Sequence, residues 1–384
     1  MRRRTVTSAL ALAVPALLLG APALAEPSAA WTPERTRELA GRLPDLRSRR
    51  TAAGARMAAL VEAEGRVSAS GLARAIDGGQ YACGPTRMRD YITESTKDWT
   101  TEDFDLIDQL GLLDWPTYHA LLFAPDGPQT YGIDGEYGKE LTKTFRRLQG
   151  FWDVDGSDIL LAAMHGSIFA DTEALVPMVT LVFEISEADA RDVIAAVQEY
   201  LAQPKFDSGR HPLFTFNAFA YSDRDAGPDE ALGVPDKIIM GDGILQCMET
   251  LGLGDVAPRG ILAHEYGHQV QYRLGLFAEH AGTPEATRET ELEADALAGY
   301  YLSHPRGERL RAQRVDAFIR TDYEVGDCSF ASNGHHGTPN QRAATGTWAE
   351  ELADAKGAKG HVLTAREVSD AFRAELPEIL TPDA

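Results

Sequence analysis

The segment at residues 261–270 constrains this chain most, because it places His264 and His268 four residues apart with Glu265 beside the first. On a helix, side chains four residues apart lie on one face, one turn above the other. Two imidazoles so placed can take two corners of a tetrahedral zinc site, and Glu265 can reach a water at the metal. The sequence therefore predicts a helix here with a metal site on one face.

The residues around this motif also favour a helix. Asp255 can cap its first turn, and Pro258 suits a first-turn position. Apolar side chains fall on the face opposite the histidines, namely Leu262, Ala263, Tyr266 and Val270. One face of this helix can therefore be buried while the other binds metal.

A second predicted helix supplies the carboxylate that a catalytic zinc site needs. Thr283 is a favourable N-cap and Pro284 a favourable first residue, and Glu291 and Asp295 then share one face. A catalytic zinc takes three protein ligands and keeps one position open, so two histidines and Glu291 meet the count. Asp295 can accept a hydrogen bond from the outer nitrogen of a ligand imidazole. A solvated acidic face is the alternative for residues 289–293, and the two histidines favour the ligand.

These motifs resemble those of a known class of enzymes. The pattern His-Glu-x-x-His at residues 264–268, followed by Glu-x-x-x-Asp at residues 291–295, resembles the gluzincin metallopeptidases. Residues 217–220 and then 237–245 are similar to the segment before the active-site helix in the HtpX and CAAX prenyl protease group. The YpfJ-like neutral zinc metallopeptidases have a comparable order of strand, backing helix, metal helix and glutamate helix. The resemblance covers residues 214–342, about a third of the chain.

The resemblance implies an α+β fold with a zincin-like core, in which a small sheet packs on the active-site helix and the glutamate helix. Helical additions flank this core at both ends. It also implies one Zn²⁺ per chain, held by His264, His268 and Glu291, with Glu265 as the general base. The expected function is that of a secreted zinc-dependent endopeptidase, which hydrolyses peptide bonds with a zinc-activated water.

The resemblance further implies two kinds of substrate contact. In zinc peptidases, the strand ahead of the active-site helix offers its edge to an extended peptide, so Ile238, Ile239 and Met240 are expected to contact substrate. Related enzymes carry a histidine or an arginine in a late loop, which assigns His336 and Arg342 to the oxyanion. An exposed polar loop is the alternative for these two residues.

The N-terminus has the features of an export signal. Residues 2–4 are basic, residues 9–20 are apolar but too short to span a bilayer, and residues 23–25 form a small-x-small cleavage site. We therefore expect a signal peptide at residues 1–25, and an extracellular or periplasmic protein with no integral membrane segment after its removal. An uncleaved anchor is the alternative. The chain departs here from the membrane-embedded members of the HtpX and CAAX group.

Charge and cysteine content narrow the expected partners and compartment. The net charge is −21, which argues against nucleic acid or anionic membranes, so a peptide or protein substrate is the expected partner. The chain has three cysteines, Cys83, Cys247 and Cys328. An exported protein can pair two of them, and the sequence leaves open which two.

The chain after the signal divides into three expected parts. Residues 26–150 are mainly helical in pattern, residues 151–345 hold the metallopeptidase domain, and residues 346–384 form a helical tail. The first part carries no recognisable chemistry and suits a pro-segment, a lid or a packing subdomain.

The expected strands lie in the central part of the chain. Apolar patterns predict strands at residues 158–163, 213–221 and 236–240, whereas residues 176–183 fit a strand or a helix.

Two other functions remain open from the sequence. A cell-wall peptide amidase would use the same zinc chemistry in a different cleft. A non-catalytic, zinc-stabilised export or scaffold protein would use the site for stability alone. Glu265 argues against this second alternative, because a structural zinc site needs no base and closes its fourth position.

Overall fold

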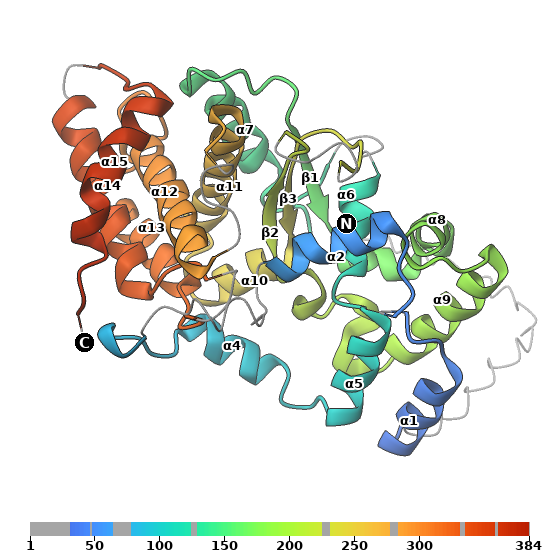
Figure 1. Cartoon of the computed structure of the whole chain (residues 1–384). Coiled ribbons are helices and arrows are strands. Elements are labelled where there is room, and N and C mark those ends of the chain that lie inside the picture. The colour runs from blue at the N-terminus through green and yellow to red at the C-terminus, as the bar shows by residue number, and fades with distance from the viewer. Residues whose placement is uncertain are drawn as a thin grey trace, which may run out of the picture.

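The protein is mostly helical, with one small mixed sheet of three strands (Figure 1). The computed structural model describes residues 31–46, 48–63, 78–123, 129–224, 231–276, 283–330, 335–357 and 360–383. The signal peptide expected at residues 1–25 lies outside these described residues. Within them, every helix is too short or too polar to cross a lipid bilayer.

The elements follow one another in this order. The first half of the chain holds α1 (Pro33–Arg42), α2 (Ala52–Ala63), η1 (Gly78–Gln80), α4 (Arg87–Ser95), α5 (Thr101–Leu110), α6 (Trp115–Leu122), α7 (Gly138–Phe151), β1 (Leu160–Met164), η2 (Gly166–Ala170), α8 (Thr172–Phe183) and α9 (Glu187–Leu201). The second half holds η3 (Pro204–Gly209), η4 (Pro212–Thr215), β2 (Ala218–Tyr221), β3 (Lys237–Gly241), α10 (Asp242–Thr250), α11 (Ala257–Leu274), α12 (Pro284–Ser303), α13 (Ala312–Val325), α14 (Pro339–Gly357) and α15 (Ala365–Ile379).

The sheet has the order β1-β3-β2, with β1 parallel and β2 antiparallel to the central strand β3. All three expected strands are present, but the one predicted from residue 213 begins only at Ala218. The chain before it turns as η4 because it passes the start of α10 at backbone contact distance. A β-carbon at Gly243 would lie 1.9 Å from the carbonyl oxygen of Pro212. Residues 176–183, which fitted either element, belong to α8, whose first turn is capped by Asp171.

The expectation that Ile238, Ile239 and Met240 offer a strand edge to substrate does not fit their place in the sheet. These residues form the centre of β3, where Ile239 pairs with Ala162 on one side and with Phe219 on the other. The backbone groups of a central strand are used by both neighbours, so β3 has no free edge to offer to a peptide. The free edge beside the motif helix belongs to β2 instead.

The two faces of β3 point into two different parts of the core. Ile239 packs in a cluster with side chains of α5, α6, α8 and α9, whereas Ile238 and Met240 pack in a second cluster with α7, α10, α11 and α12. Successive side chains of a strand point to opposite faces, which produces this division. Figure 1 shows the sheet between these two helical layers. The motif helix α11 lies in the second layer, against β2 and β3.

A buried lysine joins the sheet to the helical layer that contains α6. Lys237 is fully buried at the start of β3, and its Nζ donates to the carbonyl oxygens of Ala120 at 3.1 Å, Leu121 at 2.7 Å and Phe123 at 3.0 Å. These carbonyls belong to the end of α6, where helical backbone acceptors lack partners within the helix. Burial lowers the pKa of Lys237 to about 8. The ammonium therefore fixes α6 against the sheet.

A disulfide joins the N-terminal half to the C-terminal half. Cys83 and Cys328 are bonded, with Cα atoms 5.9 Å apart across 245 residues of sequence, and Cys247 is buried and free. Such bonds are typical of proteins from oxidising compartments.

The Lys237→Met variant should lower the free energy of unfolding by about 2–4 kcal/mol, because three buried carbonyl oxygens lose their donor. Urea unfolding followed by circular dichroism measures the effect. The exposed Lys139 provides the matched control, since Lys139→Met should change stability by about 0.5 kcal/mol or less. Equal unfolding midpoints for the two variants would contradict the role given to Lys237.

Candidate metal centre

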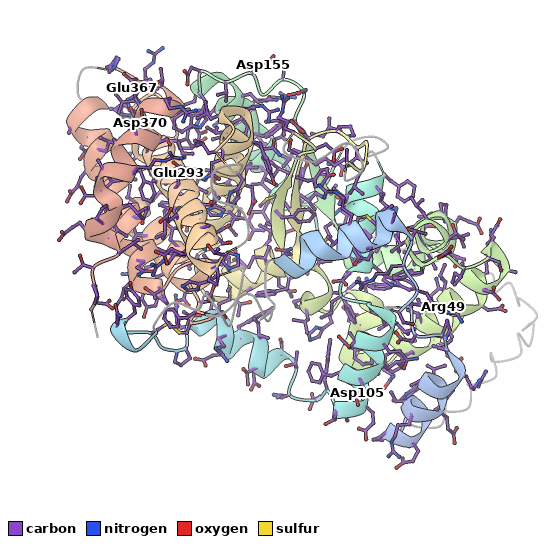
Figure 2. The ribbon with its side chains drawn as sticks, viewed as in Figure 1. Arg49, Asp105, Asp155, Glu293, Glu367 and Asp370 are labelled. Carbon is purple, nitrogen blue, oxygen red and sulfur yellow. A yellow bond between two sulfur atoms is a disulfide. The ribbon has the colours of Figure 1, made fainter. Side chains whose placement is uncertain are left out.

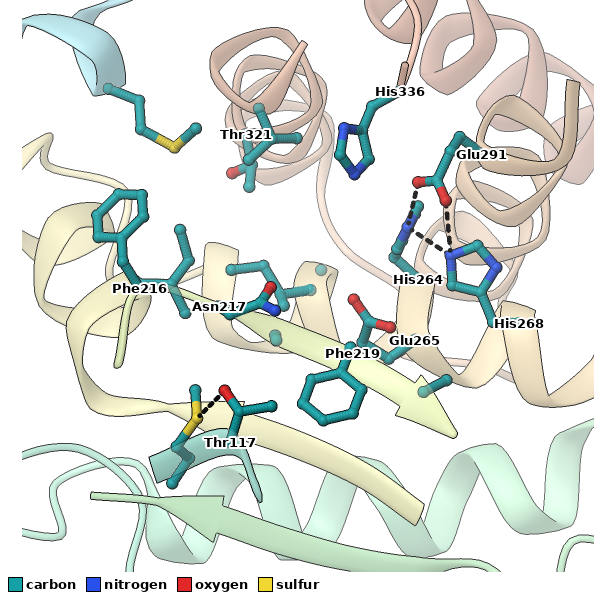
Figure 3. A pocket seen from close by; sticks show the side chains of 18 of the residues that line it. Thr117, Phe216, Asn217, Phe219, His264, Glu265, His268, Glu291, Thr321 and His336 are labelled. Atoms are coloured by element: carbon teal, nitrogen blue, oxygen red, sulfur yellow. Dashed lines mark hydrogen bonds and ion pairs between the residues drawn. The ribbon is translucent and has the colours of Figure 1, made fainter. Parts of the chain in front are cut away.

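Helix α11 carries His264, Glu265 and His268 on the face that lines a cavity (Figure 3). Pro258 lies in its first turn as expected, but the residue before the helix is Val256, which makes no side-chain cap. Asp255 was expected in that place and pairs with Arg314 instead. The helix ends at Gly275, whose φ of 69° is the left-handed conformation that glycine adopts without strain.

Glu291 on α12 meets both histidines. The Nε2 atoms of His264 and His268 lie 3.1 Å apart, and the two carboxylate oxygens of Glu291 lie 3.2 Å from the first and 3.3 Å from the second. Ligand atoms at about 2.0–2.1 Å from a tetrahedral ion are about 3.3 Å from one another. This His-His-Glu group therefore has the spacing to hold a single metal ion.

The charges around the group favour a cation. Burial alone would lower the pKa of His264, but Asp295 and Glu291 outweigh it and raise this pKa to about 10. The pKa of His268 is likewise raised, by Glu291 against the effect of burial. Burial also opposes the shift of Glu291, whose pKa nevertheless lies well below its usual value because of the neighbouring histidines. These shifts favour positive charge at the group, and a metal ion would compete with protons for the two imidazoles.

Asp295 orients His264 in the way the sequence predicts. Its Oδ1 lies 2.7 Å from Nδ1 of His264, so it accepts the Nδ1 proton and leaves Nε2 free for a metal. Arg342 donates to the same carboxylate through Nε at 2.7 Å and Nη2 at 2.6 Å. Because Asp295 is fully buried and Arg342 nearly so, each needs the opposite charge of the other. Arg342 thus supports the metal centre from behind His264, a contact that the sequence did not suggest.

Gln271 orients His268, and sequence reasoning missed it. Its Oε1 accepts from Nδ1 of His268 at 2.8 Å, while its Nε2 donates to the Thr290 carbonyl at 2.8 Å and to Glu293 at 2.9 Å. Figure 2 labels Glu293 in the helical layer that holds α12. The available signal was the position of Gln271 three residues after His268, on the same helix face.

Glu265 lies beside the metal-ligating group and faces the same cavity, which has a volume of about 540 Å³. Figure 3 shows its carboxyl group between the two histidines and Phe219 of β2. Burial raises the pKa of Glu265. A raised pKa strengthens a carboxylate as a proton acceptor, which is the property of a general base.

His336 enters the cavity from the side opposite β2 (Figure 3). Asp327 holds it in place, because its Oδ2 accepts from the His336 backbone N–H at 2.8 Å and from its Nδ1 at 3.1 Å. His335 points away, is fully buried, and bonds the other oxygen of Asp327 at 2.7 Å. Of the two neighbouring histidines, His336 is therefore the one that can reach a ligand.

Comparisons of this chain with models of known protein families, with curated protein sequences and with solved structures find no match. The likeness to gluzincins therefore rests on the motif residues and their spacing. What the structure adds is a mostly helical fold with a His-His-Glu group that can hold a metal ion.

The protein, stripped with a chelator and reloaded with zinc, should bind about one zinc per chain. His264→Ala or His268→Ala should abolish this binding, and Glu291→Ala should weaken it strongly, because two ligands rarely hold zinc alone. Elemental analysis by mass spectrometry measures the stoichiometry. His361 is an exposed histidine outside the group, so His361→Ala should retain the metal. Failure of the unsubstituted protein to take up zinc would contradict the assignment of the metal site.

Proposed function

We propose that the protein is a zinc-dependent endopeptidase in which His264, His268 and Glu291 hold the zinc. The observation that carries the proposal is Glu265, a buried carboxyl group beside a three-ligand group in an open cavity. Structural zinc sites close all four positions with protein ligands, whereas catalytic sites keep one open. Two imidazole nitrogens and one carboxylate form the donor set of catalytic zinc in peptidases.

When bound, zinc would lower the pKa of water toward about 7 and polarise a carbonyl group. The residues of the chain supply the rest. Glu265 takes a proton from the attacking water and passes it to the leaving amine, for which its raised pKa suits it. His336 donates to the carbonyl oxygen as negative charge develops there, with its ring held by Asp327.

The arrangement also supports the gluzincin resemblance and the zincin-like core that it implies. The small sheet packs on α11, and α12 brings Glu291 to α11, in the order that the motifs suggest. The disulfide and the predicted signal peptide both fit a secreted protein.

The edge of β2 is the proposed docking place for an extended peptide. Ala218, Phe219 and Ala220 line the cavity beside Glu265, and β2 pairs with β3 along its other side. Backbone groups on a free strand edge bind a peptide with little dependence on its sequence. A peptide aligned there would pass its carbonyl groups between Glu265 and His336.

The N-terminal region completes the wall of this cavity. Met88 lies in the first turn of α4, Leu113 just before α6, and Thr117 on α6. All three line the cavity together with Phe216. Residues that build the cavity wall are part of the working site. This favours a packing or lid role over a pro-segment for the region from α4 to α6, with apolar side chains of the substrate facing it.

Glu265→Gln should retain zinc and lose nearly all turnover, because an amide cannot take the proton from water. Hydrolysis of a mixed peptide library by the zinc-loaded protein, with and without a chelator, gives the reference activity. Zinc content of the variant shows that the metal site has survived. Undiminished hydrolysis by Glu265→Gln would refute the mechanism and leave the non-catalytic scaffold as the better function.

His336→Ala should lower kcat by about 10²–10³ with little change in KM, because an oxyanion donor acts on the transition state. Arg342→Gln should act differently, since loss of its bonds to Asp295 disturbs His264 and lowers zinc affinity about 10–100-fold. Steady-state kinetics and zinc competition titrations separate the two effects. Unchanged kcat in His336→Ala would show that its loop is only structural.

A further inference from the structure

The disulfide lies next to the residue that holds His336. Cys328 follows Asp327 directly in the chain, and Sγ of its partner Cys83 lies 3.5 Å from the carbonyl oxygen of Asp327. The backbone N–H of Asp327 donates to the Gly337 carbonyl at 3.0 Å, which closes the loop beside His336. The disulfide thus lies beside the backbone of Asp327, whose carboxylate bonds His335 and His336.

The Asp327 carboxylate is the centre of this loop. It accepts from the His336 backbone and ring through one oxygen and from the His335 ring through the other. Burial would raise the pKa of Asp327, but the two histidines outweigh it and hold this pKa far below its usual value. This shift favours the ionised form of Asp327. Because the carboxylate bonds both the backbone and the ring of His336, a displacement of Asp327 would move that ring.

The segment that carries Cys83 is anchored elsewhere as well. Tyr81 stacks on Phe330 at 5.9 Å between ring centroids, and its hydroxyl donates to the Leu380 carbonyl at 3.2 Å. Arg87 bonds Glu324 of α13 at 2.6 Å. These contacts do not involve the two cysteines. Loss of the disulfide is therefore expected to act on the backbone around Asp327, and α11 and α12 pack on each other independently of it.

We propose that the Cys83–Cys328 disulfide positions His336 through Asp327, so that the site reaches full turnover only after this bond has formed. The proposal rests on the peptidase function proposed above. Formation of the bond removes two protons and two electrons from the two thiols. An oxidised thiol pair such as glutathione disulfide accepts them by exchange and becomes two thiols. The reduced chain holds its metal but hydrolyses peptides slowly, which keeps it inactive until it meets an oxidising compartment.

The test compares oxidised protein, protein reduced with tris(2-carboxyethyl)phosphine, and the Cys83→Ser/Cys328→Ser double variant, all zinc-loaded and full length. Reduction and the double substitution should each lower kcat about tenfold or more, with unchanged KM and zinc content. The reductant should have no effect on the double variant, which is its matched control. Loss of zinc, or an unchanged kcat, in both disrupted forms would overturn the proposal.

A cycle with His336→Ala separates positioning from general stability. In a chain that already lacks the imidazole, the double cysteine substitution should cause no further loss of kcat. The same proportional loss with and without His336 would show that the disulfide acts on the fold as a whole, and would overturn the proposal. Asp327→Asn should reproduce the effect of reduction in the oxidised protein.

Hydrogen exchange gives a readout that needs no catalysis. The His336 amide donates to Asp327, so its exchange should speed up on reduction, while exchange at residues 264–268 stays unchanged. If no form hydrolyses any peptide, the proposed function fails, and the exchange result still decides whether the disulfide positions the loop. Equal exchange of the His336 amide in oxidised and reduced protein would overturn that positioning.

Discussion

The close approach of α11 and α12 is the contact on which the metal centre depends. A β-carbon at Gly267 would lie 3.0 Å from the carbonyl oxygen of Ala294, so the two helices touch through their backbones. Only at this separation can the short reach of Glu291 bring both its oxygens to His264 and His268. Gln271 reinforces the contact, because it bonds His268 on one helix and the Thr290 carbonyl on the other. The three candidate ligands are thus all positioned by helix packing.

The same packing buries several ionisable side chains around the group. Asp295 is compensated by Arg342 and by His264, and the acid Asp322 beside them has a pKa well above its usual value because it is buried near Asp295. Glu291 faces the imidazoles of His264 and His268 and lies near the charge of His336. A divalent cation held by His264, His268 and Glu291 would place positive charge against this carboxylate. The carboxyl of Glu265 stays available for proton transfer because the metal-ligating group does not use it.

The sequence predicted the His-His-Glu group because the spacing of its residues is local. Helical periodicity alone places His264 above His268 and Glu291 on a line with Asp295, and no knowledge of the fold is needed. Strand order is not local, so the sequence assigned the substrate edge to Ile238–Met240 although β3 lies in the centre of the sheet. The pairing of Cys83 with Cys328 and the bond from Arg342 to Asp295 likewise depend on chain folding over long separations. Catalysis by Glu265 and His336 stays a prediction, because the structure gives the positions of these side chains and a kinetic measurement is needed to show their roles.

We propose that three side chains hold one ion and leave a position open beside Glu265. X-ray absorption at the zinc edge of the zinc-loaded protein tests it most directly. Two imidazole nitrogens at about 2.0–2.1 Å and oxygen from Glu291 and solvent at about 2.0–2.2 Å are expected around the zinc, and this signal should be lost in His268→Ala together with the metal. A sulfur neighbour at about 2.3 Å, or an unchanged spectrum in His268→Ala, would contradict it.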